Sequence, residues 1–184
     1  MKRLILIRHG KTRANEAHLY CGSTDIPLSE SGAGELKPST LSLCSPTFFT
    51  SGMLRTEQTA RVLFGDAVLF PLPEFREVDF GRFEMHSYEE LKDEPAYQAW
   101  ISGDNEKNTP PGGESGEAFT ARILAALPKL SQAPGDCVLV THGGVIAAIM
   151  THLFPGEGKN RYEWQPKPGC GYIINTDKKT YTRI

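Results

Sequence analysis

The sequence predicts an α/β fold in three layers, with helices on both faces of a mostly parallel central sheet. Apolar runs of strand length alternate along the chain with segments of helical periodicity, a pattern typical of a parallel sheet. Two of these runs, Leu4–Ile7 and Val138–Val140, are each followed, after one residue, by a histidine and a glycine. Because ligands bind beyond the carboxyl ends of strands in such sheets, we expect His9 and His142 to meet in one site.

The composition is that of a compact soluble enzyme with a small-molecule partner. A length of 184 residues suits a single domain, residues 1–184, with room for a small insertion. Charged residues make up 23% and hydrophobic residues 39%, a balance that argues against disorder and against a membrane-spanning protein. The net charge of −2 argues against nucleic-acid binding, which requires a broad basic surface.

The first residues and the cysteines indicate a cytoplasmic protein. Only four apolar residues follow Met1-Lys2-Arg3 before the next charge, too few for the core of an export signal. The cysteines lack the close spacing of a zinc site or a redox pair, so we expect reduced thiols and no bound metal. They are Cys21, Cys44, Cys137 and Cys170.

Three strands and two helices are expected in the first part of the chain. The strands are residues 4–7, 48–49 and 67–70. Ser29 can cap the first helix, which the glycines after it keep short. The second helix spans residues 53–63 and carries Arg55 in its first turn. Pro71 is expected to close the third strand.

The second part of the chain begins with an insertion and then returns to helices and strands. Residues 78–113 lack a strong periodicity and are expected to form a small, mainly helical lid over the site. The next helix carries an apolar stripe, and the strand and helix after it span 136–141 and 145–154. A hairpin of residues 171–175 and 180–184 ends the chain, and its edge could pair two copies into a homodimer. The stripe consists of Phe119, Ile123, Leu127 and Leu130.

The histidines and arginines at the strand ends favour phosphate chemistry. An unprotonated imidazole can attack phosphorus, while a guanidinium group binds two phosphate oxygens at once and stays charged. Arg8 precedes His9, and Arg55 follows the second strand, so both arginines are expected beside the histidines. A single His-Gly after a strand is most often only a turn, and the joint occurrence is what favours catalysis.

A leaving alkoxide needs a proton, and residues 76–84 contain three carboxylates that could supply it. These are Glu77, Asp79 and Glu84. The residues alone leave open which of them enters the site, since charged side chains are most often solvated.

The aromatic residues of the insertion are candidates for contact with a flat substrate, because stacked rings attract each other. They are His86, Tyr88, Tyr97 and Trp100. Tyr97 and Trp100 lie three residues apart, which is also the spacing with which a small helix packs onto a core. For Trp164, substrate contact and packing onto the core are likewise both possible. His18 and His152 belong to no motif and are expected to be structural or at the surface.

Five short motifs, in order along residues 1–150, resemble those of the histidine phosphatase superfamily, whose fold is phosphoglycerate mutase-like. They are Arg8-His9-Gly10-Lys11-Thr12 with Asn15, Ser51-x-x-x-Arg55-x-x-Gln58-Thr59-Ala60, Glu77-x-x-x-Gly81, Gly113-Glu114-Ser115 and Thr141-His142-Gly143. The resemblance implies a metal-independent phosphomonoesterase without a cofactor.

The same resemblance implies a role for each site residue. His9 is transiently phosphorylated, Arg8, Arg55 and His142 surround the phosphate, and Glu77 donates the proton and later activates water. The remaining binding groups are Asn15 and the backbone N–H groups near Gly22, Ser23 and Gly143.

Within the superfamily, residues 20–29 are similar to the corresponding stretch of α-ribazole phosphatases. That similarity implies hydrolysis of α-ribazole 5′-phosphate in cobalamin biosynthesis. A phosphatase of another small phosphate ester and a phosphoglycerate mutase remain alternatives. So does a silent protein that only binds a phospho-ligand, because fold alone does not guarantee activity.

Two departures from the family pattern stand out. The usual Gly-x-Trp-Glu-Gly is here Gly81-Arg82-Phe83-Glu84-Met85, with Phe83 in place of the indole and Met85 in place of a glycine. This change is expected to reshape the lid. The usual long apolar helix after Ser29 is interrupted at Pro38.

Overall fold

The computed structural model describes residues 3–104 and 106–184. The strands are β1 (Arg3–Arg8), β2 (Thr47–Thr50), β3 (Leu69–Pro71), β4 (Cys137–Thr141), β5 (Gly171–Asn175) and β6 (Thr180–Arg183). The α-helices are α1 (Arg13–Glu16), α2 (Glu30–Glu35), α3 (Leu54–Phe64), α4 (Tyr88–Leu91), α5 (Pro95–Ile101), α6 (Gly116–Ser131), α7 (Gly143–Leu153) and α8 (Arg161–Trp164). Short 3₁₀ helices are found at Pro73–Phe75, Gly81–Phe83 and Pro155–Glu157.

The strands form one sheet in the order β3-β2-β4-β1-β5-β6. The four on the β3 side run parallel, whereas β5 and β6 are antiparallel to their neighbours. Arg8 at the end of β1 pairs with Thr141 at the end of β4. The two residues that follow, His9 and His142, therefore leave the sheet side by side at its carboxyl edge.

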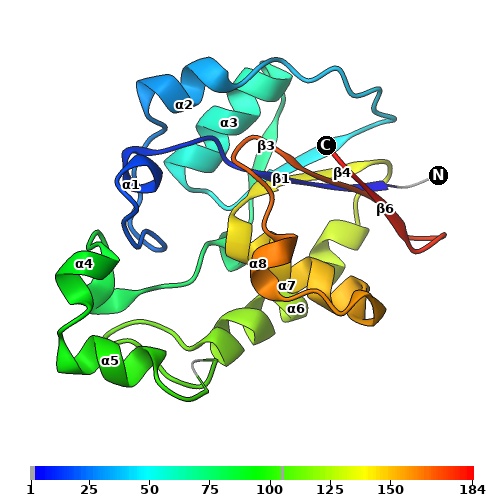
Figure 1. The fold of residues 1–184 in the computed structure, drawn as a ribbon. Helices are drawn as coiled ribbons and strands as arrows, with labels where there is room; N and C mark the ends of the chain where they lie inside the picture. Colours follow the sequence, from blue (N-terminus) through cyan, green and yellow to red (C-terminus); the bar gives the residue numbers. More distant parts are fainter. Residues whose placement is uncertain (1–2, 105) are drawn as a thin grey trace.

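Helices cover both faces of the sheet, which confirms the predicted three-layer, mostly parallel fold (Figure 1). In β1, Ile5 and Ile7 pack in the cluster that contains Ala60 of α3. Leu4 and Leu6 point the other way, into the larger core formed with α6 and α7. The apolar run of β1 has no polar residues because both of its faces are buried.

Some element boundaries differ from the expected ones, whereas the helix after Ser29 is short, as its glycines predict. Pro71 forms the last residue of β3 instead of closing it, which is possible because an edge strand tolerates a missing N–H donor. Helix α7 begins at Gly143, two residues earlier than expected, with His142 as its N-cap. Helix α2, capped by the Ser29 side chain, ends at Glu35, and residues 36–46 contain no helix or strand.

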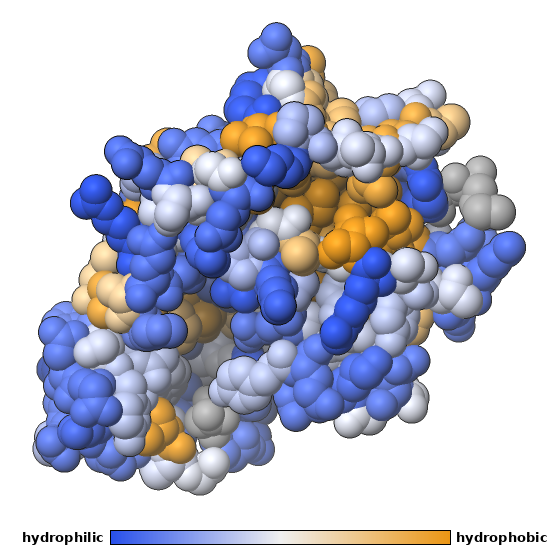
Figure 2. Space-filling model, turned by 45° about the horizontal axis from the view of Figure 1, so that its top comes forward, coloured by the Kyte–Doolittle hydropathy of each residue, from blue (hydrophilic) through white to orange (hydrophobic). Residues whose placement is uncertain are grey.

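The α3 side of the sheet is only partly covered. Leu41, Leu43, Phe64 and Ile173 belong to this layer but are only partly buried. Figure 2, which brings the top of Figure 1 forward, shows a broad apolar area on the surface.

Residues 78–113, called the insert segment below, lie away from the sheet with α4 and α5 (Figure 1). Phe83, Leu91 and Tyr97 form their own small core there, with Tyr20 and Trp100 packed against it. Phe83 is fully buried in this cluster, so a phenyl ring fills its centre. The Phe83 departure thus leaves the segment with an aromatic core.

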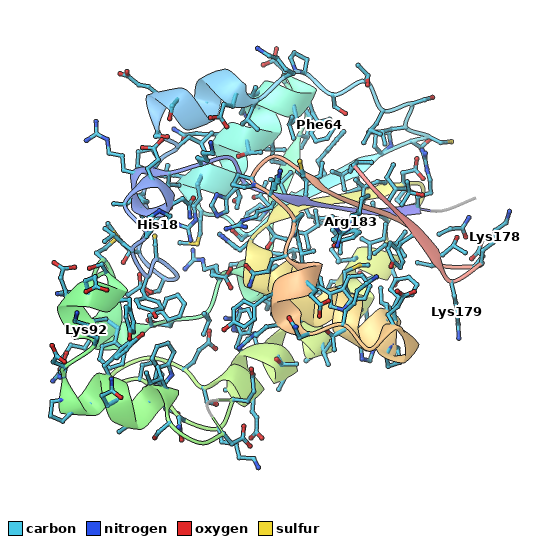
Figure 3. All side chains as sticks on the ribbon, in the orientation of Figure 1. His18, Phe64, Lys92, Lys178, Lys179 and Arg183 are labelled. Atoms are coloured by element: carbon cyan, nitrogen blue, oxygen red, sulfur yellow. The ribbon has the colours of Figure 1, made fainter. Side chains whose placement is uncertain are left out.

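No helix in the described part of the chain is long and apolar enough to cross a membrane. None of the four cysteines forms a disulfide. Lys178 and Lys179 lie at the tip of the β5–β6 hairpin, at the opposite end of the molecule from His18 (Figure 3).

Candidate active site

His9 follows β1 directly and is held in one protonation pattern. Its backbone N–H donates to Thr141 O at 2.9 Å, and its side chain is 6% exposed. Nδ1 lies 2.6 Å from Gly10 O, which can only accept, so Nδ1 carries the proton and Nε2 is free. Burial, followed by the charge of Arg55, lowers the pKa of His9 to about 3. The ring is therefore neutral near pH 7, as a nucleophilic imidazole must be.

His142 packs edge-on against His9, with 5.1 Å between the ring centroids. Nδ1 accepts from Arg55 Nε at 3.4 Å, so the proton is on Nε2, which donates to Ser51 Oγ at 2.8 Å. Burial, with His9 and the arginines as further causes, lowers the pKa of His142 well below its usual value. Both histidines are thus neutral.

Ser51 continues a chain of hydrogen bonds from His142 to the start of α3. Ser51 Oγ lies 3.1 Å from Thr56 Oγ1, which donates to Met53 O at 2.7 Å. With Met53 O as the final acceptor, the proton pattern of the whole chain is fixed from His142 outward. Ser51 belongs to the second sequence motif, and nothing in that motif indicates this role.

Arg55 lies in the first turn of α3 and is 1% exposed. Nη1 donates to Thr24 O at 2.8 Å and Nη2 to Gly22 O at 2.7 Å. With Nε on His142, three of its five N–H groups are used and two remain for a ligand. Burial lowers the pKa of Arg55, but a guanidinium stays protonated.

Arg8, at the end of β1, has a buried donor without a partner. Nη1 donates to Pro166 O at 2.9 Å, whereas Nε has no hydrogen-bond partner within the described chain. A Cβ atom built on Gly143 would lie 3.3 Å from Arg8 Nε. The glycine at the start of α7 therefore leaves the guanidinium room beside a helix N-terminus, a place that favours an anion.

Glu77 is the member of the carboxylate triplet that lies against α7. Oε2 accepts from Gly144 N at 2.9 Å and Oε1 from Val78 N at 3.1 Å. Together with Arg8 and Gly144, Glu77 lines a pocket of about 320 Å³. Its position next to Arg8 allows it to exchange a proton with a group bound at the arginine.

Arg122 of α6 holds the backbone around Glu77. Its Nη1 donates to Glu74 O at 2.7 Å and Arg76 O at 3.0 Å, and the guanidinium also pairs with Glu114. Glu114 Oε1 in turn accepts from Asp79 N at 3.2 Å. Arg122 was not among the residues predicted for the site. The apolar stripe of this helix marks the residues that face the core, but it does not show which polar residue of the helix binds a neighbouring loop.

The other two carboxylates accept hydrogen bonds mainly from backbone N–H groups. Asp79 accepts from Gly81 N at 2.8 Å and from Ser23 Oγ at 2.9 Å. Glu84 accepts from the backbone N–H groups of Gly22 and Ser23. The amides expected to bind phosphate therefore donate to a carboxylate of the protein instead.

Asn15 lies in the pocket, and its side chain also caps α1. Oδ1 accepts from Thr12 N at 3.0 Å and Thr12 Oγ1 at 3.1 Å, which leaves the amide NH₂ for a ligand.

Among the described residues, no group of three or more His, Cys, Asp and Glu side chains is arranged to hold a metal ion.

Of the aromatic candidates in the insert segment, only Trp100 lines the pocket. Tyr97 is 2% exposed in the segment's core, Tyr88 packs on Tyr97 from outside, and His86 Nδ1 bonds Glu84 O at 2.9 Å. Four further rings that line the pocket, from inside and outside the segment, were not singled out as substrate contacts: Tyr20, Phe80, Phe119 and Tyr162. Tyr97 thus packs in the core of the segment, whereas Trp100 packs against that core and also lines the pocket, where its contact with a substrate stays a prediction.

The remaining candidates lie outside this pocket. Trp164 is buried in the main core, and His152 lies exposed on α7. His18 has a φ of 54° and borders a neighbouring cavity with Arg8 and Lys11. Figure 3 shows His18 beside α1.

Comparison with known proteins identifies the family. The family model "Histidine phosphatase superfamily (branch 1)" matches residues 4–183. The chain is 35% identical over 183 residues to the adenosylcobalamin/alpha-ribazole phosphatase of Salmonella typhimurium, covering 94% of this chain and 90% of the relative. A putative alpha-ribazole-5′-P phosphatase from Escherichia coli superposes with a TM-score of 0.86 at 28% identity, covering 100% of this chain and 94% of the other.

A phosphoglycerate mutase from Thermus thermophilus superposes with a TM-score of 0.70 at 32% identity, covering 94% of this chain and 92% of the other. The family match spans nearly the whole described chain and includes every strand and helix around the pocket. The chain belongs to the histidine phosphatase superfamily, branch 1.

Proposed function

We propose that this protein hydrolyses α-ribazole 5′-phosphate to α-ribazole and phosphate through a phosphohistidine at His9. The observation that carries the proposal is how three groups gather around the N-terminus of α7. The neutral His9 packs against His142, the N-cap of this helix. Glu77 binds Gly144 in its first turn and lines a pocket with Arg8, whose Nε has no partner within the described chain. The names of the relatives in Salmonella typhimurium and Escherichia coli support the substrate.

In the first step, the lone pair of His9 Nε2 attacks phosphorus and the bond from phosphorus to the 5′ oxygen breaks. Glu77, in its acid form, gives its proton to that oxygen. Arg8 and Arg55 spread the charge of the phosphoryl oxygens. His142 lies against His9, and its Nδ1 orients Arg55 by accepting a hydrogen bond from Nε. The products of this step are α-ribazole, phosphorylated His9 and ionised Glu77.

In the second step, water attacks phosphorus and Glu77 takes the proton of that water. The bond between phosphorus and Nε2 breaks, which restores the neutral ring of His9 and releases phosphate. Because the arginines carry the charge, we expect turnover to survive an excess of chelator.

The pocket fits an ester with a charged end and a flat apolar end. Arg8, Asn15 and Glu77 line it together with Tyr20, Phe80, Trp100 and Tyr162. An aromatic base can stack on such rings. We propose that the insert segment acts as a lid, since it contributes Phe80 and Trp100 to this wall.

The test is phosphate release from α-ribazole 5′-phosphate, beside p-nitrophenyl phosphate and 3-phosphoglycerate, with His9→Ala as control. We expect a strong preference for the ribazole ester and no release by the variant. Equal, weak release from all three esters would contradict the substrate but leave the phosphatase chemistry standing.

The Thermus relative makes phosphoglycerate mutase the second candidate. Interconversion of phosphoglycerates in the presence of 2,3-bisphosphoglycerate would show that phosphate returns from His9 to a hydroxyl rather than to water. A silent binding protein would release phosphate from none of the esters.

A further inference from the structure

The loop Gly22–Thr24 directs three consecutive backbone N–H groups at one carboxylate, that of Glu84. Gly22 N lies 3.0 Å and Ser23 N 2.9 Å from Oε1, and Thr24 N lies 3.2 Å from Oε2. The Thr24 hydroxyl donates to Oε2 at 2.7 Å, and Phe80 N donates to Oε1 at 3.1 Å. Successive N–H groups of this kind form a nest for an anion, and here the anion is Glu84.

The opposite side of the same loop faces Arg55. The carbonyl groups of Gly22 and Thr24 accept from Nη2 and Nη1 at 2.7 and 2.8 Å. The peptide unit between Gly22 and Ser23 therefore donates its N–H to Glu84 and accepts Arg55 at its C=O. A carboxylate on the N–H side polarises a peptide and strengthens the bond at its oxygen.

The loop also packs against a third group. A Cβ atom on Gly22 would lie 1.6 Å from Val78 O, so the backbones of Gly22 and Val78 are in direct contact. Val78 is the neighbour of Glu77. The loop is thus fixed between Glu84, Arg55 and the segment that carries Glu77.

We infer that Glu84 is a positioning residue for Arg55: it holds the loop Gly22–Thr24 so that two loop carbonyls fix the guanidinium in the plane in which its free N–H groups meet phosphate. The inference rests on the proposed function only through the phosphate-binding role of Arg55. Charge matters in this arrangement, because a neutral amide at position 84 would direct an NH₂ group at the N–H donors of the loop.

The experiment compares wild type, Glu84→Gln, Arg55→Ala and the double variant in the full chain. Calorimetry with inorganic phosphate gives affinity without turnover, and the ¹⁵N NMR signal of Arg55 Nε–H reports whether the guanidinium is ordered. We expect Glu84→Gln to weaken phosphate binding about tenfold or more and to shift or broaden the Arg55 signal. In the Arg55→Ala background, the same change should cost nothing further.

Glu90→Gln is the matched control, because Glu90 accepts from Ser87 N and Ser87 Oγ in the insert segment without touching the loop. It should leave phosphate affinity and the Arg55 signal unchanged. Losses that add in the double variant, or an unaltered Arg55 signal in Glu84→Gln, would overturn the inference.

Thr24→Val is a milder variant for the case that Glu84→Gln does not fold. It removes one donor to Glu84 and should weaken phosphate binding less, again only when Arg55 is present. A loss of the same size in Arg55→Ala would contradict the inference. If wild type hydrolyses no ester, the proposed function fails, while the calorimetric and NMR comparisons still decide the role of Glu84.

Discussion

Glu77 and Gly144 are in direct contact at the N-terminus of α7. Gly144 N donates to Glu77 Oε2 at 2.9 Å, and a Cβ atom on Gly144 would lie 2.3 Å from Oε1. A side chain at residue 144 would therefore make the Glu77 carboxylate shift from this place.

Gly144→Ala is expected to displace Glu77 and to lower kcat by about a hundredfold, because a shift of about 1 Å in a reacting group costs that much. Steady-state kinetics with p-nitrophenyl phosphate measures this loss. Gly34→Ala is the control, since it is also a helical glycine but has nothing within 4 Å of the added Cβ. If both variants keep wild-type kcat, Glu77 does not act from this position.

The pKa of His9, about 3, makes folding stability depend on pH. The folded ring resists protonation, whereas the unfolded ring has a pKa near 6.5, so the unfolded state binds more protons between these values. Stability is then fully present above pH 6.5 and falls as the pH drops toward 3, by up to about 1.4 kcal/mol per pH unit for each such histidine. His142, whose pKa is also lowered, adds to the same trend.

Urea unfolding between pH 7.5 and 4.5 checks this slope. The range avoids Asp136, whose pKa Arg3 lowers to about 2, so that its contribution is lost only below about pH 4. His9→Gln should have a shallower slope than wild type. An identical slope in the two proteins would show that His9 is not buried as a neutral ring.

Ser51→Ala removes the acceptor of His142 Nε2–H and leaves a buried donor unpaired. We expect a loss of about 1–3 kcal/mol in the free energy of unfolding. The ring can escape this cost by moving its proton to Nδ1, but it then loses the bond from Arg55 Nε. The ¹⁵N chemical shifts of the His142 ring distinguish the tautomers, and a wild-type tautomer with wild-type stability would contradict the assignment.

Tyr162 is 73% exposed and lines the pocket, so its removal tests substrate stacking with little effect on the core. Tyr162→Ala should raise KM for α-ribazole 5′-phosphate by about two- to tenfold. KM for phosphate esters without a large ring should stay unchanged. Tyr88→Ala, an exposed tyrosine outside the pocket, is the matched control. Equal KM values for the ribazole ester in the two variants would count against the aromatic wall.

Met85 occupies a left-handed backbone conformation, with a φ of 62°. Glycine adopts this conformation without strain, although it loses more entropy on folding. Met85→Gly should therefore stabilise the protein by about 0.5–1 kcal/mol, measured by chemical denaturation. Met85→Ala, which keeps a Cβ atom, should give no such gain, and a gain as large as that of glycine would exclude backbone strain as the cause.

Much of the fold and part of the site could be predicted because the signals are local. The apolar runs that become β1 and β4 are buried on both faces, so their composition alone marks them as strands. Parallel pairing then places the residues after them, His9 and His142, at one edge. Arg55 is equally local, since it lies in the first turn of the helix after β2.

The tertiary structure decided what each carboxylate of residues 76–84 does. Glu77, Asp79 and Glu84 have the same chemistry within eight residues of chain, and only contacts with distant segments separate them. Gly144 of α7 binds Glu77, whereas Glu84 is bound by Gly22, which lies 62 residues before it. Such pairings depend on how packed elements bring remote backbone donors together, and no periodicity in the sequence records them.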